Sequence, residues 1–198
     1  MTAAVSPRLW IVAGPNGAGK STLVERFRRG RLPLVNPDII ALSLPSSAGA
    51  RRELQAGRIA IEQRRQLLAT RAAFVIETTL TGAGERQLML SAIDAGYRVG
   101  LVYVGLDDLE LSMFRVRVRV ATGGHDVPIS DLKRRFERSL ANLDLVAPLA
   151  QRLLLFDNSG RRRRLLLSRQ DSHVRFCSSD WPEWATRSPV LAGLGKGA

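Results

Sequence analysis

Polar and apolar positions along the chain fall into two kinds of stretch: short continuous apolar runs, and longer stretches with an apolar residue every three or four positions. The short runs are 9–13, 32–36, 72–76, 97–106 and 152–156. Continuous apolar runs of this length are typical of strands buried on both faces, and the longer stretches are typical of helices with one buried stripe. We expect those helices at 21–29, 45–71, 84–95 and 130–147.

The segment from Arg115 to Val120 fits two structures. Arginine and valine alternate there with period two, which by itself suggests a strand. The preceding residues 107–114 are helix-like, however, and the alternation of strands with helices requires a helix at this point. On a helix, Arg115 and Arg119 share one face. We therefore interpret the segment as a helix.

Two of the expected helices carry apolar stripes that we assign to the core. On the helix at 45–71, the stripe consists of Leu54, Gly57, Ile61 and Leu68. On the helix at 130–147, the inward residues are Leu132, Phe136, Leu140 and Leu143, with Arg134 and Arg138 facing outward. Strands alternating with helices predict an α/β fold with a five-stranded, mainly parallel sheet and helices on both faces.

The C-terminal part changes character. Apolar segments 165–167 and 174–176, separated by the polar residues 170–172, predict a β-hairpin, and 181–184 suggests a short final helix. We expect one domain over 1–198, in which 109–147 form a helical lid and substrate region and 161–198 form the C-terminal hairpin and tail.

Composition narrows the class of protein. The 198 residues are 45% hydrophobic and 24% charged, which is ordinary for a globular protein. The single cysteine, Cys177, excludes an internal disulfide and fits a reducing compartment. No apolar run reaches membrane-spanning length and the first residues lack a signal-peptide pattern, so we expect a cytoplasmic protein without a membrane partner.

The net charge of +12 is unusual, and nearly all of it is arginine, because the lysines are only Lys20, Lys133 and Lys196. Arginine matches phosphate oxygens, so a phosphorylated ligand, a nucleic acid or simple compositional bias would each explain the excess. We interpret the run from Arg161 to Arg164 as a solvated edge of the hairpin. A nucleic-acid partner is not favoured, because no aromatic side chain interleaves that run.

The segment from Gly14 to Ser21 fits G-x-x-x-x-G-K-[ST], the phosphate-binding loop, and lies between an expected strand and an expected helix. Its glycines let backbone N–H groups face an anion. Lys20 would reach the β- and γ-phosphates, and the Ser21 hydroxyl would bind Mg²⁺. The nucleotide-binding residues are therefore predicted to be Gly14, Pro15, Asn16, Gly17, Ala18, Gly19, Lys20, Ser21 and Thr22.

Carboxylates follow two neighbouring strands. Asp38 follows the second strand, where it would act as a catalytic base or merely cap a helix, and Glu77 with Thr79 follows the third. Ligands of open α/β sheets bind at the carboxyl ends of strands, so these side chains are candidates for holding an acceptor or a metal–water shell. The segment 157–159 at the fifth strand's end would border the adenine or form a simple turn.

Some nucleotide-binding classes lack support in the sequence. No N/T-K-x-D segment reads a guanine base, and no strand ends in the Asp-Glu pair common in motor ATPases. A phosphate loop, two carboxylates and an arginine-rich segment broken by Gly123 and Gly124 favour phosphoryl transfer to a hydroxyl, with ATP or GTP and Mg²⁺. Two alternatives stay open: a kinase acting on a nucleic-acid end, and a nucleotide-binding module with slow hydrolysis and a protein partner.

These motifs resemble, in order over about residues 8–160, the zeta-toxin family of P-loop kinases. The resemblance implies transfer of phosphate from ATP or GTP to a sugar hydroxyl of UDP-N-acetylglucosamine, and an antitoxin as a candidate partner. It implies that Asp38 is the base, that Glu77 and Thr79 contact the small-molecule acceptor, and that Arg119 belongs to the mobile arginine segment. For the second arginine of that segment it leaves two candidates, His125 and Arg135.

Overall fold

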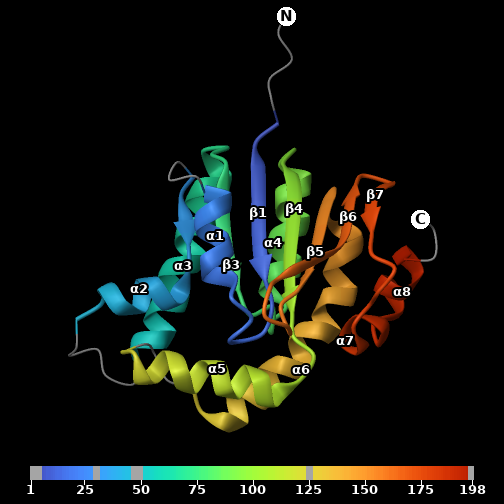
Figure 1. Cartoon of the computed structure of the whole chain (residues 1–198). Helices are drawn as coiled ribbons and strands as arrows, with labels where there is room; N and C mark the ends of the chain where they lie inside the picture. The colour runs from blue at the N-terminus through green and yellow to red at the C-terminus, as the bar shows by residue number, and fades with distance from the viewer. Residues whose placement is uncertain (1–5, 29–31, 46–50, 124–126, 196–198) are drawn as a thin grey trace, which may run out of the picture.

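The computed structural model describes residues 6–28, 32–45, 51–123 and 127–195. Its strands form one sheet in the order β2-β3-β1-β4-β5-β6-β7 (Figure 1). The strands are β1 (Arg8–Ala13), β2 (Leu34–Val35), β3 (Phe74–Thr78), β4 (Arg98–Gly105), β5 (Arg152–Asp157), β6 (Arg164–Gln170) and β7 (His173–Cys177). The α/β class and the five parallel strands are confirmed.

The predicted C-terminal hairpin is present, but it extends the same sheet, which therefore has seven strands in the described residues. β6 pairs antiparallel with β5, and β7 pairs antiparallel with β6. A short connection suffices for this, because antiparallel neighbours need no helical crossover. The hairpin therefore covers what would otherwise be the open edge of β5.

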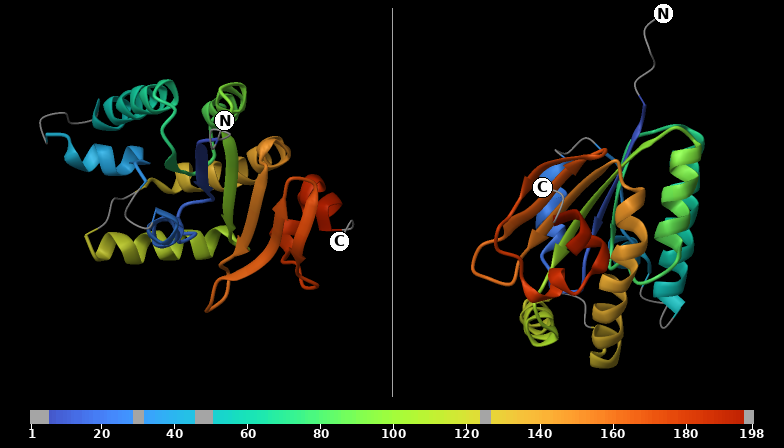
Figure 2. Two further views of the ribbon diagram at one scale, coloured as in Figure 1. Left: turned by 90° about the horizontal axis from the view of Figure 1, so that it is seen from above. Right: turned by 90° about the vertical axis from the view of Figure 1, so that its right-hand side faces the viewer.

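Helices lie on both faces of the sheet, with α3, α4 and α6 on one side and α1 and α5 on the other (Figure 2). The helices are α1 (Lys20–Arg28), α2 (Pro37–Ser43), α3 (Arg52–Ala69), α4 (Gly84–Asp94), α5 (Leu109–Ala121), α6 (Ile129–Val146), α7 (Glu183–Thr186) and α8 (Pro189–Gly195). A 3-10 turn, Ala147–Leu149, follows α6.

Alternate residues of each strand belong to two separate cores, because successive side chains of a strand point to opposite faces of the sheet. The larger core holds Leu9 and Ile11 of β1 and packs against α4, α6, α7 and α8. The smaller core holds Val12, Val102 and Val104 and packs against α1. The two faces of the sheet therefore differ in how much of their area helices cover. On the face of the larger core, helices cover most of the sheet, whereas on the other face α1 covers only the region around β1 and β3.

The helical interpretation of 115–120 is confirmed. The Asp108 side chain caps α5 by accepting a 2.6 Å hydrogen bond from the N–H of Leu111. Within the helix Val116 is buried, while Arg115 and Arg119 turn together toward the nucleotide loop's pocket. A local capping signal and tertiary packing thus override the period-two pattern.

Leu68 of the stripe predicted for the 45–71 helix packs against the larger core, but the prediction is wrong at Leu54 and Ile61. The helix itself is α3, and the side chains of Leu54 and Ile61 are 61% and 49% exposed. Ala56 and Ala60 are the buried residues of α3 instead. These small side chains lie one helical turn apart and allow the helix to approach its neighbours closely, so the buried stripe is narrower and less hydrophobic than the sequence suggests.

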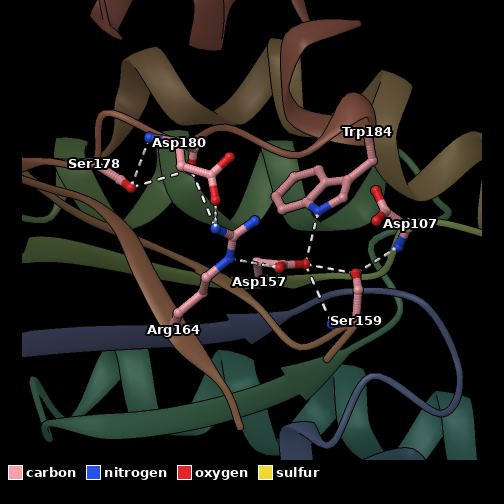
Figure 3. Close-up of polar contacts among 7 residues, drawn as sticks. All are labelled: Asp107, Asp157, Ser159, Arg164, Ser178, Asp180 and Trp184. Carbon is pink, nitrogen blue, oxygen red and sulfur yellow. Dashed lines mark hydrogen bonds and ion pairs between the residues drawn. The ribbon is translucent and has the colours of Figure 1, made fainter. Parts of the chain in front are cut away.

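The short helix predicted near 181–184 exists as α7, but it is not the final helix, because α8 follows it. Trp184 of α7 is buried against the end of β5 (Figure 3). Its indole Nε1–H donates a 3.1 Å hydrogen bond to Asp157 Oδ1, while Arg164 Nε donates to Asp157 Oδ2 at 2.9 Å. Arg164 also pairs with Asp180. Arg164 is therefore part of a structural network at the start of β6, which corrects the interpretation of the whole arginine run as a solvated edge.

Burial raises the pKa of Asp157, but hydrogen bonds from Ser159, Arg164 and Trp184 outweigh burial and hold that pKa below its ordinary value. Asp157 is therefore committed to the fold, and it is not among the residues that line the nucleotide loop's pocket. Its neighbour Asn158 makes the contact with that loop, by donating a 2.9 Å hydrogen bond to the carbonyl of Ala18.

Candidate active site

The phosphate-binding loop connects β1 to α1 at the carboxyl edge of the sheet, as predicted. Gly17 has a φ of +73°, and a Cβ there would lie 2.8 Å from the carbonyl oxygen of Ser112, so the turn needs glycine. The Ser112 hydroxyl donates a 2.7 Å hydrogen bond to the carbonyl of Asn16. Helix α5 therefore packs directly against the loop and helps to hold its shape.

Lys20 is the first residue of α1 and is only 8% exposed. Its ammonium group donates a 2.9 Å hydrogen bond to the carbonyl of Pro15. Burial lowers the pKa of Lys20 to about 8, and it outweighs the opposing effects of Glu77 and Asp38, while Arg119 and Arg135 lower the pKa further. These groups, far apart in sequence, therefore lie within electrostatic reach of one ammonium group.

Glu77 joins the loop to the second strand's end. The Ser21 hydroxyl donates to Glu77 Oε1 at 2.8 Å, and Asn36 Nδ2 donates to Glu77 Oε2 at 2.9 Å. Glu77 and Asn36 are both buried, at the carboxyl ends of adjacent strands β3 and β2. The carboxylate is thus oriented by two side-chain donors and lies beside the predicted metal ligand.

Asp38 lies in the first turn of α2 and is exposed. The cap of that helix is Asn36, whose Oδ1 accepts a 2.9 Å hydrogen bond from the N–H of Asp38. The interpretation of Asp38 as the helix cap is therefore wrong. Its carboxylate lines the same pocket as Lys20.

One pocket of about 580 Å³ brings the predicted residues together. Predicted residues on its wall are Asn16, Gly17, Gly19, Lys20, Ser21, Thr22, Asp38, Glu77, Thr79, Arg119 and Arg135. Gly14, Pro15 and Ala18 are buried behind the loop and shape it from inside. His125 lies outside the described residues.

Four more arginines line the pocket and were not predicted as site residues: Arg64, Arg115, Arg134 and Arg138. Arg134 and Arg138 are exposed, as expected, and they also line the pocket. Helix α6 extends beyond the strand ends and lies beside α5 there (Figure 1). The spacing of Arg134, Arg135 and Arg138 on one helical face was the available signal.

Arg64 and Glu85 form the far wall, with their charged groups 3.9 Å apart and each side chain 12% exposed. Thr78 Oγ1 donates a 2.9 Å hydrogen bond to Glu85 Oε1. Burial lowers the pKa of Arg64, with Glu85 opposing that effect. This wall is therefore pre-organised, since its charged groups are already paired before any ligand arrives.

The donor set around Ser21 suits Mg²⁺ rather than a fully protein-ligated metal. Among the described residues, no group of three or more His, Cys, Asp or Glu side chains is placed to hold a metal ion. Mg²⁺ usually keeps several waters and takes its other ligands from phosphate oxygens and one or two protein oxygens. The Ser21 hydroxyl with Glu77 beside it fits that pattern.

Every helix in the described part of the chain is too short or too polar to cross a membrane.

Comparisons with known proteins agree with this architecture. A family model described as an AAA domain matches residues 9–143. An uncharacterised protein of Haemophilus influenzae is 31% identical over an alignment of 140 residues, and the match covers 67% of this chain and 99% of that protein.

Two solved structures share the fold. The AvrRxo1-ORF1:-ORF2 complex with ATP has a TM-score of 0.67 and 19% identity over 85% of this chain, and the match spans only 60% of that chain. A structure of the PezAT toxin–antitoxin system of Streptococcus pneumoniae has a TM-score of 0.65 and 15% identity over 99% of this chain and 86% of that chain. The chain thus shares its fold with these two structures. Since the family model covers more than half of the sequence, the chain belongs to the AAA-domain family of P-loop proteins.

Proposed function

We propose that this protein is an ATP-dependent phosphotransferase that moves the γ-phosphoryl group to a hydroxyl of a small molecule. The convergence of Lys20, Asp38, Glu77 and the arginines on one pocket carries the proposal. A buried ammonium group beside a glycine-rich loop binds phosphates, an acidic side chain opposite accepts a proton, and cations stabilise transferred charge.

Lys20 and the N-terminal end of α1 hold the triphosphate. The first N–H groups of a helix have no partner inside the helix, and those of α1 begin at the loop. The lowered pKa of Lys20 means that its proton is held poorly while no anion is near. A phosphate oxygen would strengthen that binding, so the site is suited to an anionic ligand.

Asp38 accepts the proton of the acceptor hydroxyl as that oxygen attacks phosphorus. Both side chains line the pocket, but Asp38 is exposed, whereas Glu77 is buried and its two carboxylate oxygens are engaged by Ser21 and Asn36. Those contacts support a second assignment: Glu77 orients the Ser21 hydroxyl and the water shell of Mg²⁺ rather than holding the acceptor. Bound Mg²⁺ would neutralise charge on the β- and γ-phosphates.

The acceptor occupies the side of the pocket opposite the loop, between Thr79, Arg64 and the α6 arginines. The number of cations there supports an acceptor that itself carries phosphate, and a UDP-sugar, which the zeta-toxin resemblance suggests, is the first candidate. Arg119 and Arg135 neutralise the transferred group. Closure of α5 and α6, which carry these two arginines, over the pocket would keep water from the γ-phosphate.

A partner protein that controls access to the pocket is part of the proposal. The two similar structures reported above are a two-component complex and a toxin–antitoxin system. An antitoxin for this chain would be expected to inhibit phosphoryl transfer when it is added in equal amount.

The function is tested with γ-labelled ATP and a panel of hydroxyl-bearing acceptors that includes UDP-sugars. We expect label in one acceptor class with the wild type and none with Lys20→Ala, while Lys133→Ala on exposed α6 serves as the charge-matched control. ATP hydrolysis that no acceptor stimulates would contradict the transferase assignment. Unchanged activity in Lys20→Ala would contradict the whole site.

A further inference from the structure

A second surface, separate from the pocket, combines aromatic rings with arginines. On the side of the sheet that faces the viewer in Figure 1, no helix of the described residues lies over β4, β5 and β6, whereas α4 and α6 cover the opposite side. We call the following set the open sheet face: Arg8, Trp10, Arg152, Phe156, Arg163 and Phe176. None of them lines the pocket.

Strand pairing places these residues on one face. Trp10 pairs with Gly100, and Gly100 pairs with Arg152, so the three lie in one row across β1, β4 and β5. Leu154 pairs with Ser168, and Ser168 pairs with Phe176. Leu154 and Phe156 belong to the smaller core together with Val102, which fixes this side as the one that α1 covers only in part.

The rings are accessible. Phe176 is 45% exposed, and Trp10 and Phe156 are partly exposed. A Cβ at Gly100 would lie 2.4 Å from the Trp10 ring, so the indole lies directly against the β4 backbone. The Arg163 guanidinium lies 5.5 Å from the centre of the Phe156 ring. Phe176 and part of the Trp10 indole therefore face solvent, while the Arg163 guanidinium lies over the Phe156 ring.

The charge of the face is positive. Arg8 of β1 lies opposite Arg98 of β4 in the strand register, and Arg152 lies on β5, the next strand of the sheet. Asp171 balances one of these charges, because it accepts two hydrogen bonds from Arg98. Arg152 is bonded to the neutral amide of Gln170. A recess of about 60 Å³ lined by Arg8, Trp10, Gly100 and Arg152, among others, lies at the same end.

We propose that the open sheet face binds single-stranded nucleic acid. Such strands are recognised by aromatic rings on which bases stack, placed beside cations that contact the phosphates, and a sheet surface is a common platform for this. The sequence argument against a nucleic-acid partner was the lack of aromatic residues within the arginine run. The fold supplies them from other strands, since Phe156 lies beneath Arg163 and Trp10 and Phe176 lie on the same face.

The experiment measures fluorescence anisotropy of a labelled single-stranded RNA of roughly 12 nucleotides with the full chain. We expect binding that weakens linearly in a log–log plot as salt rises from about 50 to about 200 mM. Phe176→Ala should weaken binding by about tenfold. Because Phe176 is exposed, this variant should fold, and Trp10→Ala provides a second variant if its melting curve is cooperative. No binding at low salt would overturn the proposal.

A charge-matched pair of double variants tests the location. Arg8→Ala with Arg152→Ala should weaken RNA binding by about tenfold or more, whereas Arg58→Ala with Arg65→Ala, which changes exposed α3 arginines, should leave it unchanged. Equal loss in both would mean nonspecific attraction to a basic protein and would overturn the proposal. Saturating ATP should leave RNA binding unchanged. Competition by ATP would place the RNA in the pocket and would likewise overturn it.

A second copy of this chain is the remaining candidate for covering the open sheet face, and sedimentation tests it. A concentration-dependent dimer that Phe176→Ala converts to monomer would show that a second copy covers the face, against the proposal. Phosphoryl transfer by the Phe176→Ala variant is measured in parallel. We expect it to be unchanged, so failure of the RNA-binding proposal can be distinguished from failure of the kinase proposal.

Discussion

The Ser21 hydroxyl donates a 2.8 Å hydrogen bond to Glu77 Oε1, across 56 positions of sequence. This contact joins the nucleotide loop to the end of β3. The other oxygen of Glu77 is held by Asn36 at the end of β2, so three adjacent elements at the carboxyl edge of the sheet share one carboxylate. The carboxylate is thereby placed to orient the predicted metal ligand and its waters.

Glu77→Gln should weaken the apparent affinity for Mg²⁺ in the kinase reaction by about 10–100-fold, because a neutral amide orients the metal's ligands less well than a carboxylate. Binding of nucleotide in the presence of a chelator should change little. A titration of the transfer rate with Mg²⁺ measures the first quantity and equilibrium binding of a labelled nucleotide the second. Glu62→Gln on exposed α3 is the matched control. An unchanged Mg²⁺ titration would return Glu77 to the role of an acceptor contact.

Asp38→Asn should keep nucleotide binding and slow phosphoryl transfer by about 10²–10⁴-fold, which corresponds to roughly 3–5 kcal/mol in the barrier. The amide cannot accept the acceptor's proton, whereas the shape of the pocket is preserved. Single-turnover transfer at saturating ATP measures the chemical step. Asp94→Asn, at the exposed end of α4, controls for loss of one negative charge. Transfer at the wild-type rate would show that another group is the base.

The fold could be predicted because the parallel strands are buried on both faces and therefore appear as continuous apolar runs. The buried stripe of α3 could not, because the core there uses Ala56 and Ala60, and more hydrophobic residues of the same helix face solvent. A helix that packs closely against its neighbours through small side chains shows only a weak apolar pattern in its sequence. Hydrophobicity alone therefore identified the helix but not its buried face.

The phosphate loop, Asp38 and Glu77 could be predicted as one site because the carboxyl ends of parallel strands meet at one edge. Arg134 and Arg138 could not, because their helix extends beyond the sheet and its outer face borders the pocket there. Asn36 was also missed as the partner of Glu77. An asparagine before Pro-Asp indicates a helix cap, and its second role depends on a neighbour in space.

Trp184→Phe should destabilise the fold by about 1.5–3 kcal/mol, because it removes a donor to the buried carboxylate of Asp157 while keeping most of the ring. Trp181→Phe is the matched control: its indole donates to the neutral carbonyl of Ser178, so we expect about 0.5–1.5 kcal/mol. Urea denaturation at neutral pH measures both.

The same variant has an expected pH dependence. The pKa of Asp157 is lowered in the folded protein, so its stabilising contribution is present above the ordinary value of 3.8 and is lost as the pH falls through the folded value. The gap in stability between wild type and Trp184→Phe should therefore narrow in acid. A gap that stays constant to low pH would mean that the indole stabilises through packing alone.

The charge of Lys20 destabilises the fold because it is buried, but the same charge is needed to bind the phosphates. The pKa of Lys20 is about 8 in the folded protein against 10.5 ordinarily, so the unfolded chain binds more protons between these values and stability rises with pH in that window. Below about pH 8 the full cost of burying the charge, roughly 3 kcal/mol, is present. Lys20→Met removes that charge and also the hydrogen bond to Pro15, so we expect a net gain of about 1–3 kcal/mol at pH 7. The gain should vanish above about pH 10.

Urea denaturation at pH 7 and at about pH 10 measures this difference, with Lys133→Met on the exposed side of α6 as the control. The gain must be accompanied by loss of nucleotide binding, since the same ammonium group meets the phosphates. In the wild type, nucleotide affinity should fall as the pH rises through about 8, because deprotonated Lys20 no longer attracts an anion. A Lys20→Met variant less stable than wild type at pH 7 would mean that the hydrogen bond to Pro15 outweighs the burial of charge. The loop would then be held by its lysine even without a nucleotide.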